Sequence, residues 1–77
     1  IRKMPDLSTF VIKTQPPGSF GELSAICLEG KTVTAPTLRE GVIKLMDAFD
    51  IGQNDVEDAP DSEGKRLMLV ILNASST

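Results

Sequence analysis

Three short segments in the first half of the chain have the pattern of β-strands. Residues 8–14 (STFVIKT) and 32–35 (TVTA) are rich in β-branched or aromatic residues, and residues 22–29 (ELSAICLE) contain a further apolar run. Residues 15–21 (QPPGSFG) hold two prolines and two glycines, which favour a turn or loop. Between the second and third segments, Gly30-Lys31 breaks the apolar pattern, and glycine adopts positive φ without steric cost. The sequence therefore predicts a β-hairpin with its tip at Gly30-Lys31.

The middle of the chain has the period of an amphipathic helix. Thr37-Leu38-Arg39-Glu40 has the T-x-x-E form of a capping box and follows a proline. Behind this cap, one apolar stripe runs at helical spacing, and Gly52 is well placed to end the helix. The pattern predicts a helix over Leu38–Asp50. The stripe consists of Leu38, Val42, Leu45, Met46 and Phe49.

The last third of the chain divides into a polar and an apolar stretch. Residues 53–64 are acidic and turn-rich, and we expect an acidic loop there. Residues 65–73 (KRLMLVILN) contain six consecutive apolar residues and resemble a strand. Side chains alternate between the faces of a sheet, so an unbroken apolar run predicts a strand that is buried on both faces.

One helix covers only one face of a sheet, so this strand predicts a further contact. A partner molecule, a second copy or a second domain would cover the other face, unless residues 15–21 or 1–7 of the same chain fold over it. On this interpretation the interface residues are Met68, Val70 and Leu72, or their odd-numbered neighbours if the strand has the opposite orientation. Phe20, an aromatic residue on a predicted loop, is a second interface candidate.

These elements together predict the fold class. We expect a single small α+β domain spanning residues 1–77, with a mostly antiparallel sheet of three to four strands and one amphipathic helix packed across it. Residues 1–7 are expected to be an irregular lead-in. The chain begins at Ile1 rather than at a methionine, and we expect a fragment or a processed part of a larger protein.

Composition argues against several kinds of function. The net charge is −3, the eight basic residues are scattered, and there is no Trp or Tyr, so we expect no nucleic-acid binding. No apolar run approaches the roughly 20 residues that span a bilayer, so we expect no membrane insertion. The absence of His removes the commonest general base and zinc ligand, and we expect no enzyme activity, metal or cofactor. The single cysteine, Cys27, is typical of a reducing compartment, and we expect a cytoplasmic location.

Two motifs suggest ligand sites but lack the required context. Gly30-Lys31-Thr32 matches the end of a phosphate-binding loop, but Ala25 stands where the first glycine is needed, and a strand-like segment follows where a helix is needed. From Asp50, the acidic stretch has the wrong residues for a calcium-binding loop. The hairpin and the solvated loop are the preferred interpretations.

Some segments resemble the ubiquitin-like domains of the β-grasp fold. STFVIKT is similar to the opening strand of those domains, TLREGVIKLMDAFDI (residues 37–51) to their helix, and PDSEGKRLML (residues 60–69) to the stretch before a later strand. The resemblance implies a binding module that uses its sheet or an edge strand. Residues 73–77 (NASST) lack the terminal diglycine of conjugated modifiers, so conjugation is not implied.

These observations predict a non-catalytic module for protein–protein interaction or self-association. It would use an apolar sheet face or an edge strand to bind a protein partner or to form a homo-oligomer. The alternative is a structural subunit of a viral or phage assembly, in which the same strand makes repeated contacts.

Overall fold

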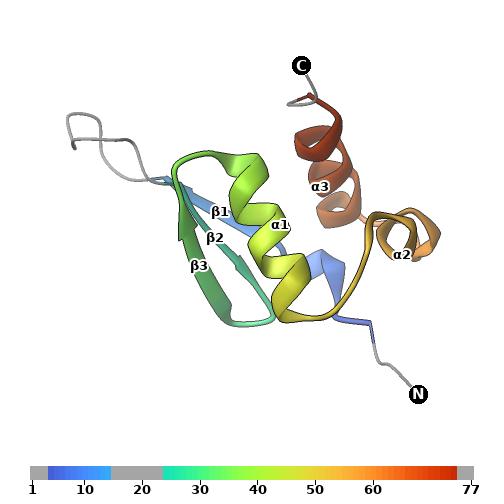
Figure 1. Ribbon diagram of the computed structural model, residues 1–77. Coiled ribbons are helices and arrows are strands. Elements are labelled where there is room, and N and C mark those ends of the chain that lie inside the picture. The colour runs from blue at the N-terminus through green and yellow to red at the C-terminus, as the bar shows by residue number, and fades with distance from the viewer. Residues whose placement is uncertain (1–3, 15–23, 75–77) are drawn as a thin grey trace.

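The computed structural model describes residues 4–14 and 24–74 and has an α+β fold (Figure 1). Within these residues, three strands form one antiparallel sheet in the order β1-β2-β3, accompanied by three α-helices and one 3-10 helix. The elements are η1 (Leu7–Thr9), β1 (Val11–Thr14), β2 (Ser24–Leu28), β3 (Lys31–Ala35), α1 (Leu38–Ala48), α2 (Gln53–Asp58) and α3 (Glu63–Ala74).

The predicted hairpin is confirmed, with its tip one residue earlier than expected. Strand β2 ends at Leu28 and β3 begins at Lys31, and these two residues are paired across the turn. The turn residues Glu29 and Gly30 both have positive φ, 49° and 82°. Two-residue turns of this kind match the twist of paired strands, which is why they join hairpins. Gly30-Lys31-Thr32 therefore lies in a hairpin, and no helix follows it.

The predicted amphipathic helix is also confirmed as α1, which crosses β2 and β3 on one face of the sheet (Figure 1). The Thr37 hydroxyl accepts a hydrogen bond from the Glu40 amide at 3.2 Å, as the capping box predicts. The end of the helix differs from the prediction. Asp50, with φ of 55°, makes the left-handed turn after the helix, and Gly52 instead caps the start of α2.

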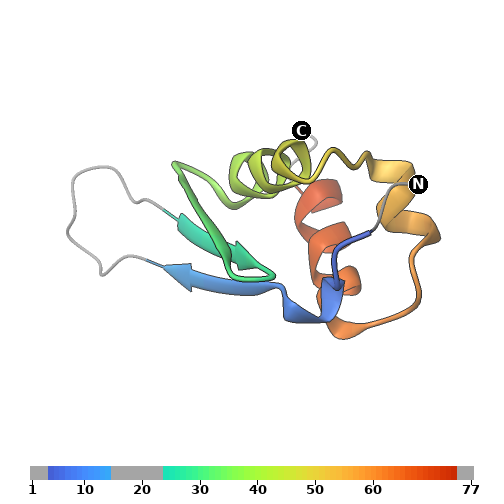
Figure 2. The same cartoon turned by 90° about the horizontal axis from the view of Figure 1, so that it is seen from below.

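The core lies between the sheet, α1 and α3. Its fully buried members come from four different elements, so the three helices and the sheet share one core rather than two. Figure 2 shows α2 and α3 beyond the end of the sheet at which β1 begins, next to η1. The largest fully buried side chains are Ile26, Leu28, Val42, Leu45, Val56 and Met68.

The prediction for the last third of the chain is wrong. Residues 65–73 form most of helix α3 instead of a strand, and residues 53–64 contain helix α2 and the start of α3 instead of a continuous loop. A short apolar run has no periodicity of its own, so it fits a buried helix as well as a strand. Four of its six residues are Leu or Met, which favour helices. Over residues 4–14 and 24–74 the sheet therefore has three strands, and residues 65–73 do not form a fourth, two-sided strand.

Candidate interaction surface

Helix α3 sorts the apolar run into a buried and an exposed side. Met68 is fully buried, and Ile71 and Leu72, which follow at helical spacing, are buried beside it. Leu67 and Val70 lie three residues apart on the other side, where 37% and 61% of their surfaces are exposed. We call Leu67 and Val70 the α3 stripe. Single exposed apolar residues scattered over a surface are common, but two on adjacent turns of one helix form a small continuous patch.

The predicted interface residues within the described ranges differ in their exposure to solvent. Met68 and Leu72 belong to the core, so they are not available to a partner in the folded chain. Val70 is exposed as an interface residue must be. Phe20 lies outside the described residues. The reason for the difference is the period of the element: Met68, Val70 and Leu72 would share one face of a strand, but they do not share one face of a helix.

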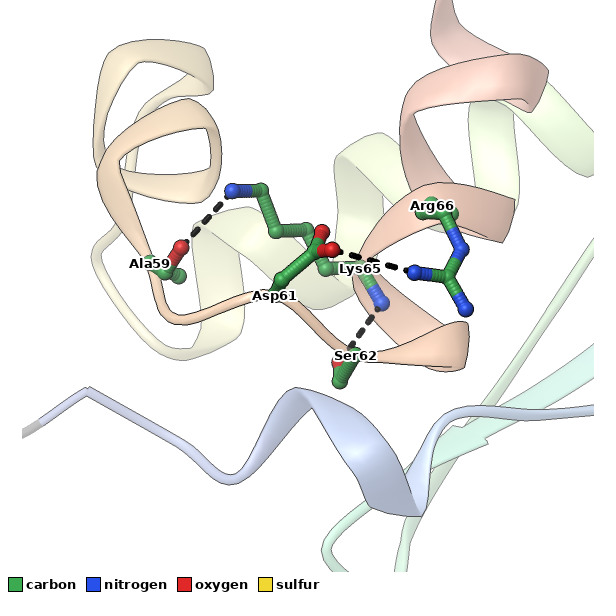
Figure 3. A network of polar contacts seen from close by, with 5 residues as sticks. All are labelled: Ala59, Asp61, Ser62, Lys65 and Arg66. Carbon is green, nitrogen blue, oxygen red and sulfur yellow. Dashed lines mark hydrogen bonds and ion pairs between the residues drawn. The ribbon is translucent and has the colours of Figure 1, made fainter.

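A group of polar contacts fixes the start of α3 (Figure 3). The Ser62 hydroxyl accepts a hydrogen bond from the Lys65 amide at 3.1 Å, and the Ser62 carbonyl accepts one from the Arg66 amide at 3.1 Å. Lys65 Nζ donates to the carbonyl of Ala59 at 2.7 Å, which ties α3 back to the end of α2. The ion pair between Arg66 and Asp61, at 3.1 Å, is mostly exposed and contributes at most about 1 kcal/mol. These contacts set the direction in which α3 leaves α2.

Close packing against η1 fixes the other side of the helix start. Gly64 is buried, and a Cβ atom at this position would overlap the carbonyl oxygen of Leu7 and lie 3.3 Å from the Cβ of Phe10. The helix therefore approaches the backbone of η1 more closely than any residue with a side chain allows. This contact, together with the Ser62 cap, determines which face of α3 is buried.

The face of the sheet opposite α1 is not an apolar surface. In the paired register, Val11 and Lys13 of β1 share this face with Cys27 of β2 and with Thr32 and Thr34 of β3. Val11 is 47% exposed, and the lysine and the threonines are exposed. Such a mixed face is typical of an antiparallel sheet with one side in water.

A cavity of about 410 Å³ lies between residues 4–7 and the α2–α3 connection. Its polar groups are engaged in local contacts: Asp61 pairs with Arg66, and Ser62 caps α3. The Asp6 carboxylate accepts hydrogen bonds from the Ser8 amide at 3.1 Å and hydroxyl at 2.6 Å. The cavity is lined by Met4, Pro5, Asp6, Leu7, Ala59, Pro60, Asp61 and Ser62.

The bonds from Ser8 have an electrostatic consequence for Asp6. They favour the ionised carboxylate, first through the hydroxyl and then through the backbone amide, and they lower the pKa of Asp6 below its ordinary value. Two further bonds tie η1 to the hairpin turn: the Asp6 amide donates to Glu29 Oε2 at 2.7 Å, and the Glu29 amide donates to Thr9 Oγ1 at 2.8 Å. Asp6 is therefore a structural cap.

Over 4–14 and 24–74, no three His, Cys, Asp or Glu side chains are grouped so that they could hold a metal ion. None of the helices within those ranges is long and apolar enough to cross a membrane.

Sequence reasoning missed Val11 as an exposed apolar residue and included Leu67 only among the odd-numbered alternatives to Met68, Val70 and Leu72. Two signals in the sequence identify the helix that exposes Leu67. The first signal is Ser62 followed by Glu63, the order of an N-cap residue and an acidic first turn. The second is the i, i+3, i+4 spacing of Met68, Ile71 and Leu72, which is typical of a buried helix face. Val11 has no comparable signal, because its exposure depends on which face of β1 is turned toward the core.

Comparison with family models, with curated proteins and with solved structures finds no match to this chain.

Proposed function

We propose that this chain is a non-catalytic protein-binding module whose contact surface is centred on the α3 stripe. The exposure of Val70 supports the proposal most directly, because it is the most exposed large apolar side chain among the described residues. Leu67, one turn earlier, extends the same apolar surface. The likeness of residues 8–14 and 37–51 to ubiquitin-like domains agrees with a binding role and remains a prediction.

The size of the stripe suggests what it contributes. Burying a Val or Leu side chain completely is worth about 1.5–3 kcal/mol, so covering two partly exposed ones is worth roughly 2 kcal/mol. Binding energy concentrates in a few central apolar side chains with polar residues around them. Arg66 and Asn73, both exposed, lie near the stripe along α3 and would belong to such a polar rim. A partner with an apolar ridge or an amphipathic helix suits this surface.

The test compares the unmodified chain with Val70→Lys and with a control, Ala48→Lys. Both substitutions add one positive charge at an exposed helix position, so neither should unfold the chain. Each chain serves as bait in affinity purification, and calorimetry then measures the dissociation constant of the purified partner for all three. We expect Ala48→Lys to bind like the unmodified chain and Val70→Lys to bind at least about tenfold more weakly. Equal dissociation constants, or no protein retained by the unmodified chain, would contradict the proposal.

A further inference from the structure

The hairpin geometry determines which backbone groups of the sheet point outward. In a two-residue hairpin, the residues that flank the turn exchange both backbone hydrogen bonds, and hydrogen-bonded and non-hydrogen-bonded pairs then alternate. Leu28 and Lys31 flank the turn, so Ile26–Val33 is the next hydrogen-bonded pair. Ala25–Thr34 is a non-hydrogen-bonded pair, and the N–H and C=O groups of Thr34 therefore point away from β2.

At the β3 edge, one of these outward groups is already occupied. Lys44 of α1 donates from Nζ to the carbonyl of Thr34 at 3.1 Å. An approaching strand would have to displace this ammonium group. An ammonium group that already occupies an edge carbonyl competes with an incoming strand for that group. The β3 edge is thus poorly suited to pairing.

The β1 edge differs. The backbone groups of Ala25 and Cys27 point toward β1, where they pair with Lys13 and Val11. Ile12, between these two, therefore directs its N–H and C=O away from the sheet. Among the described elements, β1 makes its extended contact with β2 alone, and α1 packs over β2 and β3 instead. An unpaired strand edge is a template for another strand.

We propose that the β1 edge pairs antiparallel with the β1 edge of a second copy of this chain, about a two-fold axis through Ile12. This register aligns the outward groups of both strands: the two Ile12 residues exchange both hydrogen bonds, and the Thr14 amide of each copy donates to the Phe10 carbonyl of the other. The Phe10 amide is not needed, since it already donates to Leu7 at 3.2 Å.

The side chains favour a second copy over an unrelated strand. In this register Val11 of each copy lies opposite Lys13 of the other, so the lysine stem covers an exposed apolar side chain and no like charges face each other. A two-fold axis through Lys13 would place the two lysines opposite each other, which is unfavourable. A foreign strand draws its specificity from side-chain pockets, and the cavity at residues 4–7 and 59–62 is lined by no residue of β1.

The pairing involves four residues per strand, so we expect weak association, with a dissociation constant of about 0.1–1 mM. It does not involve the α3 stripe, and its success or failure is independent of the proposed function.

The test combines amide hydrogen exchange by NMR with two charge variants. Between about 20 µM and about 1 mM, exchange of the Ile12 amide should slow as the dimer forms, whereas the Val11 and Lys13 amides should be protected at both concentrations. Val11→Lys should weaken association roughly fivefold in sedimentation experiments, and Val11→Glu should strengthen it by a similar factor, with both effects reduced by salt. Thr32→Lys, on the same sheet face but on β3, is the matched control and should change nothing.

Three results would overturn the inference. The first is an Ile12 exchange rate that is independent of concentration. The second is the same effect from both Val11 variants. The third is a concentration-dependent change confined to Leu67 and Val70, which would place self-association on α3 instead.

Discussion

At the scale of single residues, side chains of the same chemical type have different roles in different elements of the fold. Met68 and Val70 are two residues apart in one apolar run, yet Met68 is completely buried and Val70 is 61% exposed. Gly30 is needed for its positive φ, whereas Gly64 is needed because no side chain fits against Leu7. Asp50 adopts the left-handed conformation expected of Gly52. Residue type alone does not assign these roles, since each depends on contacts far along the chain.

A prediction at this scale concerns the Asp6 cap. The hydroxyl and amide of Ser8 stabilise the ionised carboxylate, so the pKa of Asp6 in the folded chain should lie below that of an unfolded aspartate, about 3.9. Because the folded pKa is the lower one, the stabilisation is present above the unfolded pKa and is lost as the pH falls through the folded value.

An NMR titration of the side-chain carboxyl carbon measures this pKa. Ser8→Ala should return it toward its ordinary value, and Thr34→Ala, toward the end of β3 that is away from the hairpin turn, should leave it unchanged. A pKa of Asp6 at or above 3.9 in the unmodified chain would contradict the cap.

At the scale of elements, the packing of α3 on η1 determines which side of the helix is exposed. Gly64→Ala would force a methyl group into the backbone of Leu7. Alanine favours a helix by about 1 kcal/mol over glycine, but a backbone overlap costs more, and we expect a net loss of about 2 kcal/mol or more in the free energy of unfolding. Urea denaturation measures this change.

Gly52→Ala is the control, because a Cβ there lies 3.8 Å from its nearest neighbour, Asp55. Equal stability of Gly64→Ala and the unmodified chain would show that α3 does not pack on η1 in this way.

Elements with a strong local signal were predictable from the sequence. The capping box at Thr37 and the apolar stripe behind it predicted α1, and Gly30 between two β-favouring segments predicted the hairpin. Helix α2 has six residues and a single buried apolar one, Val56, so it lacks a measurable period. Its formation depends on contacts with α3 and on the cap at Gly52.

The candidate site was predictable only in part. Val70 was included for a reason that does not hold, since residues 65–73 are not a two-sided strand. The β1 edge at Ile12, which has no strand partner among the described residues, was not predictable from composition, because it follows from the register of β1, β2 and β3.

At the scale of the whole molecule, one chain forms a shared core and leaves two separate candidate contact surfaces. The α3 stripe is apolar and would be covered by side chains, whereas the β1 edge offers backbone hydrogen bonds. The two variants that test them, at Val70 and Val11, are both at exposed positions, so a loss of binding would not reflect unfolding. Together they separate binding of a partner from self-association.

The α3 stripe exists only if residues 65–73 are helical, because a helix and a strand expose different residues of the same run. The most direct measurement is the set of 13Cα chemical shifts of the isotope-labelled chain in solution. We expect a continuous run of positive deviations from random-coil values over Glu63–Ala74, as in a helix. Negative deviations across Leu67–Leu72, as in a strand, would contradict the helix and would remove the α3 stripe.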